Sequence, residues 1–276
     1  MNQLIGQFLL AFREALEAAL ITAIILAYLK RTGRSLLSKY VWYGVYVAMG
    51  ASVVIGIFVW LLYGSLTGST KALFEGVAAL FAVFVISSMI YWMASKGREL
   101  RNEVEQRVKD IVTRGATLAL TSFSFIVTFR EGLETVLFLT PFLVDDAAST
   151  FVGAFLGVVG SIILAYAMFV VGMRINMHKF FYFTSILLVL LAGGLVGYGV
   201  HELVEYTGSA SWGWLGQPAY NLNIPSDSAF HHKGVVGSVF AVMFGYTVNA
   251  EWARVLVHLA YLAIAIPLIV WVYRKK

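Results

Sequence analysis

Long apolar runs separated by short charged gaps constrain this chain more than any other feature of its sequence. A membrane-crossing helix needs about 20 predominantly apolar residues, and runs of that length recur from one end of the sequence to the other. Because 60% of the 276 residues are hydrophobic and only 13% are charged, the chain cannot keep most of its surface in water. We therefore predict an all-α polytopic membrane protein with about seven transmembrane helices. The predicted spans are residues 4–29, 40–63, 72–94, 116–142, 151–173, 180–200 and 253–273.

Basic residues gather in alternate gaps between these spans. Three of the gaps and the C-terminal tail hold 15 of the 20 Lys and Arg residues, so the positive-inside rule places the N-terminus outside and the C-terminus in the cytoplasm. The +5 net charge is thus explained by topology, and no nucleic-acid partner is expected. The 15 residues are Lys30, Arg31, Arg34, Lys39, Lys96, Arg98, Arg101, Arg107, Lys109, Arg114, Arg174, Lys179, Arg274, Lys275 and Lys276.

Two segments outside the spans also carry predictions. Residues 234–249 are apolar but number only 16, and an eighth crossing would place the basic tail outside. We therefore interpret them as an interfacial or re-entrant segment. Residues 97–114 contain the i,i+4 pairs Glu103/Arg107 and Glu105/Lys109, a spacing that predicts a solvated cytoplasmic helix.

One charged motif occurs twice, 117 positions apart. Residues 8–20 and 125–137 are identical at seven of 13 positions, including every charged one: Arg13, Glu14 and Glu17 align with Arg130, Glu131 and Glu134. Because three predicted spans separate the copies, they run through the membrane in opposite directions. Residues 4–94 and 116–205 are therefore predicted to form an inverted repeat of three plus three helices, an arrangement that places substrate near the membrane midplane.

The repeated charges lie where charge is costly. An Arg or Asp at the centre of a spanning helix costs ~2.5–3.5 kcal/mol even on mild scales. The i,i+4 spacing lets Arg13 hold Glu17 and Arg130 hold Glu134, which predicts that Glu14 and Glu131 are freer to bind an ion. Four carboxylates and two guanidiniums leave a formal charge of −2, which a hard multivalent cation complements. The alternative is that each helix simply neutralises its own charges as structural ion pairs.

Other residues are weaker candidates for metal binding. Glu75, His201, Glu202 and Glu205 lie at the outer ends of their predicted spans and suggest an entrance or second metal site. Asp227, His231 and His232 in the outer loop could capture metal or simply face water. Met89 and Met93 could suggest copper(I), but packing is favoured because the chain contains no cysteine and its carboxylates are hard ligands. Gly132 is expected to let the two motif helices approach each other closely.

The doubled motif, Arg13-Glu-Ala-Leu-Glu17 and Arg130-Glu-Gly-Leu-Glu134, resembles the paired R-E-G-L-E motifs of the oxidase-dependent iron permeases. This family comprises fungal high-affinity iron permeases and bacterial EfeU-type iron transporters. The resemblance covers nearly the whole chain, although Ala15 replaces the motif glycine and the fungal D-A-S-E motif is missing. It implies iron uptake across the plasma membrane, with the motif glutamates as iron ligands and usually an extracytoplasmic oxidising partner.

The function predicted from these observations is an iron permease, not an enzyme. Residues 1–276 form one transmembrane permease domain, made of the two repeats, an outer loop at 206–233 and a C-terminal helix at 253–273. Iron is the transported substrate, ferric or freshly oxidised from ferrous, and no cofactor is permanently bound. The expected partners are the lipid bilayer and a separate extracytoplasmic oxidase or iron-delivery protein. A divalent cation permease for Fe²⁺, Mn²⁺ or Pb²⁺ and, more remotely, a haem-binding membrane redox protein remain alternatives.

Overall fold

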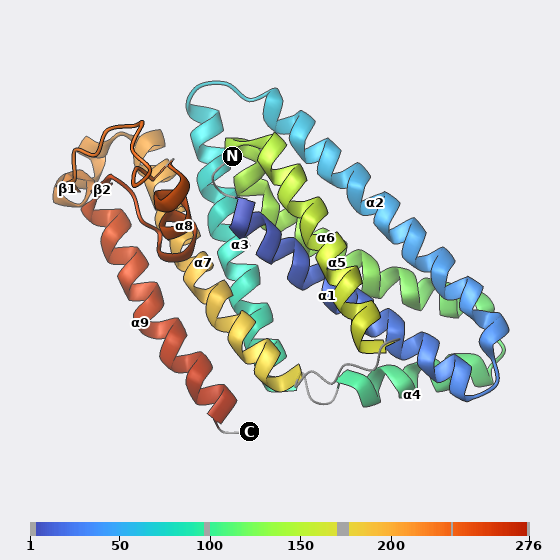
Figure 1. The fold of residues 1–276 in the computed structure, drawn as a ribbon. Coiled ribbons are helices and arrows are strands. Elements are labelled where there is room, and N and C mark those ends of the chain that lie inside the picture. The colour runs from blue at the N-terminus through green and yellow to red at the C-terminus, as the bar shows by residue number, and fades with distance from the viewer. Residues whose placement is uncertain (1–3, 97–99, 170–176, 233, 275–276) are drawn as a thin grey trace.

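The computed structural model describes residues 4–96, 100–169, 177–232 and 234–274. Helices dominate, and the long ones lie side by side as a bundle with a small, partly irregular unit at one end (Figure 1). The elements are α1 (Leu4–Arg31), η1 (Ser35–Leu37), α2 (Ser38–Gly64), α3 (Ser69–Lys96), α4 (Leu100–Thr113), α5 (Thr117–Asp145), α6 (Ala147–Phe169), α7 (Met177–Thr207), η2 (Ser209–Gly216), β1 (Pro218–Asn221), α8 (Val235–Phe244), β2 (Asn249–Glu251) and α9 (Trp252–Arg274).

The predicted fold class is confirmed. Five helical stretches are long and apolar enough to cross a membrane: Ser35–Gly64, Ser69–Ser95, Ala147–Met168, Phe180–Thr207 and Trp252–Arg274. Helices α1 and α5 are also long enough to cross, with 28 and 29 residues, but each carries the three charges of a motif copy. Their crossing, and hence the count of seven spans, stays a prediction. The basic residues Arg98, Arg174, Lys275 and Lys276, used for the orientation, lie outside the described residues.

The long helices pack in three principal pairs. Helix α1 packs on α6, α2 on α5, and α3 on α7. When α1, α2 and α3 exchange places with α5, α6 and α7, respectively, the same three pairs are recovered. Helix α9 is added outside this set, against α7. The largest group of buried apolar side chains draws on α1, α3, α5, α7 and α9, so the motif helices run through the interior of the bundle.

Glycines allow the closest helix contacts within these pairs. A Cβ at Gly44 of α2 would meet the Thr121 carbonyl oxygen of α5 and lie 2.8 Å from the Phe125 nitrogen. A Cβ at Gly157 of α6 would lie 2.7 Å from both the Phe12 nitrogen and the Phe8 carbonyl oxygen of α1. Backbone-to-backbone contact therefore requires glycine at both positions, since no side chain fits between the helices.

Substitution at Gly44 is expected to destabilise the protein. Gly44→Leu forces α2 away from α5, and overpacking of this kind typically costs ~1–3 kcal/mol or more. The thermal unfolding midpoint of the detergent-solubilised variant should therefore fall. Gly50→Leu is the matched control, because a Cβ at Gly50 on the same helix meets nothing within 4 Å. Equal midpoints for the two variants would contradict the close α2–α5 contact.

The turn from α5 into α6 is fixed by Asp146. Its carboxylate accepts hydrogen bonds from the Ser149 hydroxyl at 2.6 Å and the Ser149 backbone nitrogen at 3.1 Å. These bonds lower the pKa of Asp146 to about 2, so the carboxylate is ionised at neutral pH and caps the first turn of α6.

Helix α4 is solvated on one face only. Val104, Val108 and Val112 follow one another at i,i+4 spacing and are buried with residues of α1 and α5, among them Leu29 and Leu120. The other face carries the charges predicted from the sequence, and Glu105 pairs with Arg31 of α1 at 2.6 Å. The helix therefore braces the ends of α1 and α5, which a fully solvated helix would not do.

The segment between α7 and α9 folds back on itself. Strand β1 precedes α8 in the sequence and strand β2 follows it. The two strands pair with each other in an antiparallel arrangement. Helix α8 has ten residues, about 15 Å at 1.5 Å per residue, and it ends at Gly245 in the left-handed conformation. That length is half of a ~30 Å hydrocarbon core, so α8 does not make an eighth crossing. Whether it is interfacial or re-entrant stays a prediction.

Candidate metal centre

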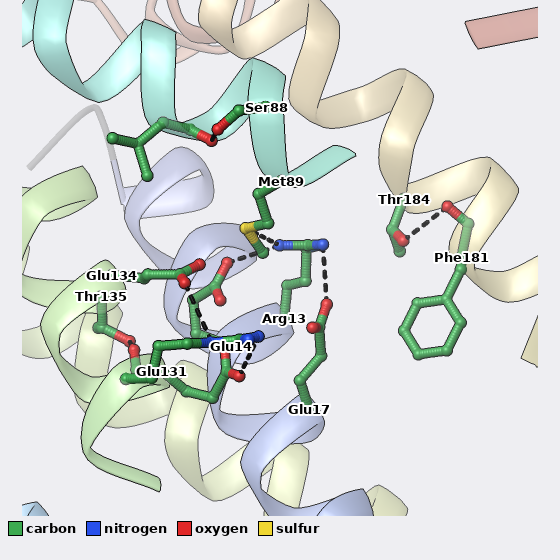
Figure 2. A network of polar contacts seen from close by, with 12 residues as sticks. Arg13, Glu14, Glu17, Ser88, Met89, Glu131, Glu134, Thr135, Phe181 and Thr184 are labelled. Carbon is green, nitrogen blue, oxygen red and sulfur yellow. Dashed lines mark hydrogen bonds and ion pairs between the residues drawn. The ribbon is translucent and has the colours of Figure 1, made fainter. Parts of the chain in front are cut away.

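The motif residues lie in the middle of α1 and α5. Glu14 is ten residues after the start of α1, about 15 Å along its axis, and Glu131 is 14 residues after the start of α5, about 21 Å. Alanine and leucine around the charges of α1 favour helix, and both helices continue through the motif without a break. Because α1 contacts α5 directly, the two copies meet inside the bundle (Figure 2).

Each arginine binds both glutamates of its own copy. Arg13 contacts Glu14 at 2.7 Å and Glu17 at 2.8 Å. Arg130 contacts Glu131 at 2.7 Å and Glu134 at 3.3 Å. The i,i+4 pairs expected from the sequence are therefore present. The premise that Glu14 and Glu131 are less restrained by arginine is wrong, because each Arg side chain also reaches the carboxylate of its i+1 neighbour. Whether they bind an ion stays a prediction.

Three of the four motif glutamates converge. Oxygens of Glu14, Glu131 and Glu134 all lie within 4.8 Å of one another. Each of the three carboxylates also has a buried oxygen, Oε2, that accepts no hydrogen bond in the described part of the chain. Unsatisfied carboxylate oxygens that face one another repel, and their burial is unfavourable unless a cation binds between them. The fourth, Glu17, lies across the Arg13 guanidinium from Glu14 (Figure 2).

The two copies of the motif are buried to different extents in the bundle. The Arg13 side chain is 2% exposed and Glu14 is fully buried, whereas Arg130 is 48% exposed and Glu134 is 16% exposed. The Arg130 guanidinium stacks over the Trp92 ring of α3, 5.4 Å from its centroid. The carboxylate cluster is therefore closed on the α1 side and accessible on the α5 side.

Gly132 and Met89 lie beside the motif residues. Gly132 was predicted to allow close contact between α1 and α5, and this prediction is wrong. A Cβ there would instead meet the Ser52 hydroxyl of α2, so this glycine allows α5 to approach α2. Met89 of α3 is buried and its sulfur accepts a hydrogen bond from Arg13 at 3.2 Å. Met89 is therefore a poor ligand for copper(I), because the positive charge of the Arg13 guanidinium would repel the copper ion.

A second acidic group forms at the ends of α3 and α7. His201, Glu202 and Glu205 offer ligand atoms within 4.8 Å of one another. Glu75 accepts hydrogen bonds from the hydroxyls of Tyr63 at 2.7 Å and Tyr198 at 2.6 Å. Glu202 lies close enough to Glu75 to interact with it, so the structure brings together the predicted residues of α3 and α7.

Sequence reasoning missed three partners in this outer group. Tyr198 lies on the same helix face as Glu202 and Glu205, at i,i+4,i+7 spacing, and that spacing could have identified it. Tyr63 and Glu251 come from distant elements and had no such signal. Glu251 binds His201 Nδ1 at 3.1 Å, which directs the imidazole toward β2. In the outer loop, Asp227, His231 and His232 do not form a three-ligand group among the described residues.

Comparison with known proteins identifies the family. The sequence profile of the Iron permease FTR1 family matches residues 4–272, nearly the whole chain. The chain belongs to the FTR1 iron permease family. The resemblance inferred from the doubled motif is thereby confirmed, and with it a role in iron transport.

This FTR1 family member is similar to curated proteins over nearly its whole length. It is 33% identical over 264 residues to the ferrous iron permease EfeU of Yersinia pestis, covering 95% of this chain and 91% of the relative. It is 31% identical over 258 residues to EfeU of Escherichia coli strain 536, covering 92% and 91%. An uncharacterised protein of Archaeoglobus fulgidus is 42% identical over 270 residues, covering 98% and 95%. No solved structure matches this permease.

Proposed function

We propose that this chain carries iron across the plasma membrane and that the ion binds between Glu14, Glu131 and Glu134. The observation that supports this site most directly is the convergence of three carboxylates, each with a buried oxygen that accepts no hydrogen bond. Oxygen ligands suit hard, highly charged cations. Arg13 and Arg130 bind the carboxylates and fix their orientation, while Glu17 pairs with Arg13 from the other side.

Ferric iron, freshly oxidised from ferrous iron, is the transported form that the ligand set favours. The cluster offers carboxylate oxygens, and the chain contains no cysteine that would favour a softer ion. Ferric iron would then be supplied by a separate extracytoplasmic oxidase. The second candidate is transport of Fe²⁺ itself, because the Yersinia and Escherichia relatives are named ferrous iron permeases.

The inverted repeat is proposed to provide the two halves of the transporter. The helix pairs α1–α6, α2–α5 and α3–α7 support this division, because they are preserved when the halves exchange. The accessible side of the cluster, at Arg130, lies beside Trp92, four residues from the end of α3. The Arg130 side is therefore the side from which we expect an ion to enter or leave the cluster.

The outer acidic group is proposed as the entrance. Glu75, His201, Glu202 and Glu205 lie near the ends of α3 and α7 that the charge distribution assigns to the outside. Carboxylates and imidazole at this position would attract a cation and hold it before it moves inward.

The proposed orientation predicts which ends of the chain are reachable on intact cells. A tag at the N-terminus or within residues 209–216 should react with a membrane-impermeant reagent, and a tag after Lys276 should react only after permeabilisation. The natural absence of cysteine makes single-cysteine labelling a direct alternative to tags. Labelling of the C-terminal tag from outside would contradict the topology and the proposed direction of iron movement.

Uptake into proteoliposomes tests the proposed function. Vesicles containing the purified protein should accumulate radioactive iron faster than empty vesicles, and ferric citrate should be a better substrate than ferrous iron held reduced by ascorbate. Faster uptake of Fe²⁺ would favour the second candidate, and equal rates with and without protein would contradict both. A Soret band in the visible spectrum of the purified protein would instead indicate the haem-binding alternative.

A further inference from the structure

A cavity of about 340 Å³ lies between α7, α8 and α9, outside both glutamate groups. Its wall is formed partly by polar side chains, Arg254, His258, Tyr220 and Tyr246, and partly by apolar ones. Helix α8 packs against α7 (Figure 1), and residues of α8 and of both strands contribute to the lining. A wall of this mixed composition is typical of a site for an amphipathic ligand.

Arg254 provides the charge in this cavity. It is the third residue of α9, and its side-chain stem lies on α7, where a Cβ at Gly197 would be 3.3 Å from Arg254 Cγ. In the described part of the chain, its guanidinium makes no ion pair within 4.0 Å. The nearest carboxylate in the sequence, Glu251, binds His201 and interacts with Arg254 only at longer range. The cavity thus contains a guanidinium whose donors are available to an anion.

The apolar side of the cavity faces the exterior of the bundle. Phe240 and Phe244 of α8 are each 50% exposed, and Leu259 of α9 is 56% exposed. Leu259 lies on α9, which is apolar enough to cross a membrane, and all three side chains line the same cavity, so we expect lipid acyl chains to contact them. The apolar side of the cavity is therefore expected to face lipid, while the positive charge of Arg254 lies on its partly buried side.

We propose that this cavity binds one phospholipid, with its phosphate on Arg254 and an acyl chain along Phe240, Phe244 and Leu259. A guanidinium matches a phosphate with two parallel hydrogen bonds. Arg254 is only two residues, about 3 Å, from the start of α9, which is the depth of lipid headgroups if α9 spans the bilayer. A soluble phosphate would gain nothing from the exposed phenylalanines, so a lipid fits the whole lining better.

The role of this lipid is to tie α8 to α9. Helix α8 and the strand pair are adjacent to the outer acidic group through Glu251, which is the last residue of β2. A lipid between α8 and α9 would hold that segment against the bundle. This inference concerns lipid binding alone and does not depend on the identity of the transported ion.

Native mass spectrometry of the detergent-purified protein tests the proposal. Wild-type protein titrated with phosphatidylglycerol should retain one lipid per chain, and Arg254→Gln should weaken retention by about tenfold or more, equivalent to ~1.4 kcal/mol. Diacylglycerol, which has the same chains without the phosphate, should not be retained. Arg274→Gln is the matched control, because it removes an arginine from the opposite end of the same helix and should leave retention unchanged.

Two further measurements keep the proposal open to contradiction. Arg254→Lys preserves the charge if Arg254→Gln fails to fold, and it should still bind phosphatidylglycerol more weakly than wild type because an ammonium lacks the planar pair of donors. Millimolar inorganic phosphate should not displace the lipid. Equal retention by wild type and both Arg254 variants would overturn the assignment of Arg254, and displacement by phosphate would show a soluble-anion site instead of a lipid site.

Discussion

Glu134→Gln is expected to reduce iron uptake about tenfold or more while the protein still accumulates in the membrane. The substitution keeps the size and polarity of the side chain but removes one of the three charges that face the proposed ion. Glu14→Gln and Glu131→Gln should have the same effect, because all three carboxylates contribute an oxygen without a hydrogen-bond partner. Glu17→Gln should reduce uptake less, since Glu17 lies outside the converging group.

Uptake of radioactive iron by cells that express matched amounts of each variant measures this prediction. Glu105→Gln on α4 is the control, because it also removes one negative charge but lies away from the cluster, paired with Arg31. Wild-type uptake by all three cluster variants at normal abundance would mean that the carboxylates are structural. The outer group of Glu75, Glu202 and Glu205 would then be the next candidate.

Arg13→Gln is expected to lower abundance far more than Arg130→Gln. Arg13 is 2% exposed, and its removal leaves Glu14 and Glu17 buried without a counter-charge, which typically costs ~3–5 kcal/mol. Arg130 is 48% exposed and one of its partners, Glu134, is 16% exposed, so its removal leaves one deeply buried carboxylate, Glu131, without a counter-charge instead of two and should cost less. From the sequence alone, the matched motif copies predict equal effects, so the difference follows only from how the helices pack.

Fluorescence-detected size-exclusion chromatography of solubilised membranes measures this difference. The Arg13 variant should give a small or aggregated peak, and the Arg130 variant should give a larger, monodisperse peak. Arg31→Gln serves as the control for loss of an exposed arginine on α1. Similar loss of both motif variants would show that the two copies are equally buried in the membrane, contrary to the structure.

The sequence predicted the helices well because their signal is local. Apolar run length determined where helices such as α2, α3 and α6 lie to within a few residues, and the doubled motif identified the charged pairs. The short helix α8 was correctly separated from the spans because its apolar segment is too short to cross.

Contacts between distant helices could not be read in the same way. The bridging of Glu14 by Arg13 depends on an arginine rotamer, and the partner of Gly132 depends on which helix packs beside α5. Tyr63 and Glu251 join the outer group only because the fold brings their elements to it. The difference in burial between Arg13 and Arg130 likewise has no counterpart in the sequence, where the two copies are alike.

The most direct test of the proposed metal centre is equilibrium iron binding to purified protein. Wild-type protein and the triple variant Glu14→Gln, Glu131→Gln, Glu134→Gln are dialysed against radioactive iron, and bound iron is measured per chain. If the three carboxylates form the iron site, the triple variant binds one iron fewer than wild type, with an unchanged chromatographic profile. Equal binding by a folded triple variant would contradict the assignment of the site.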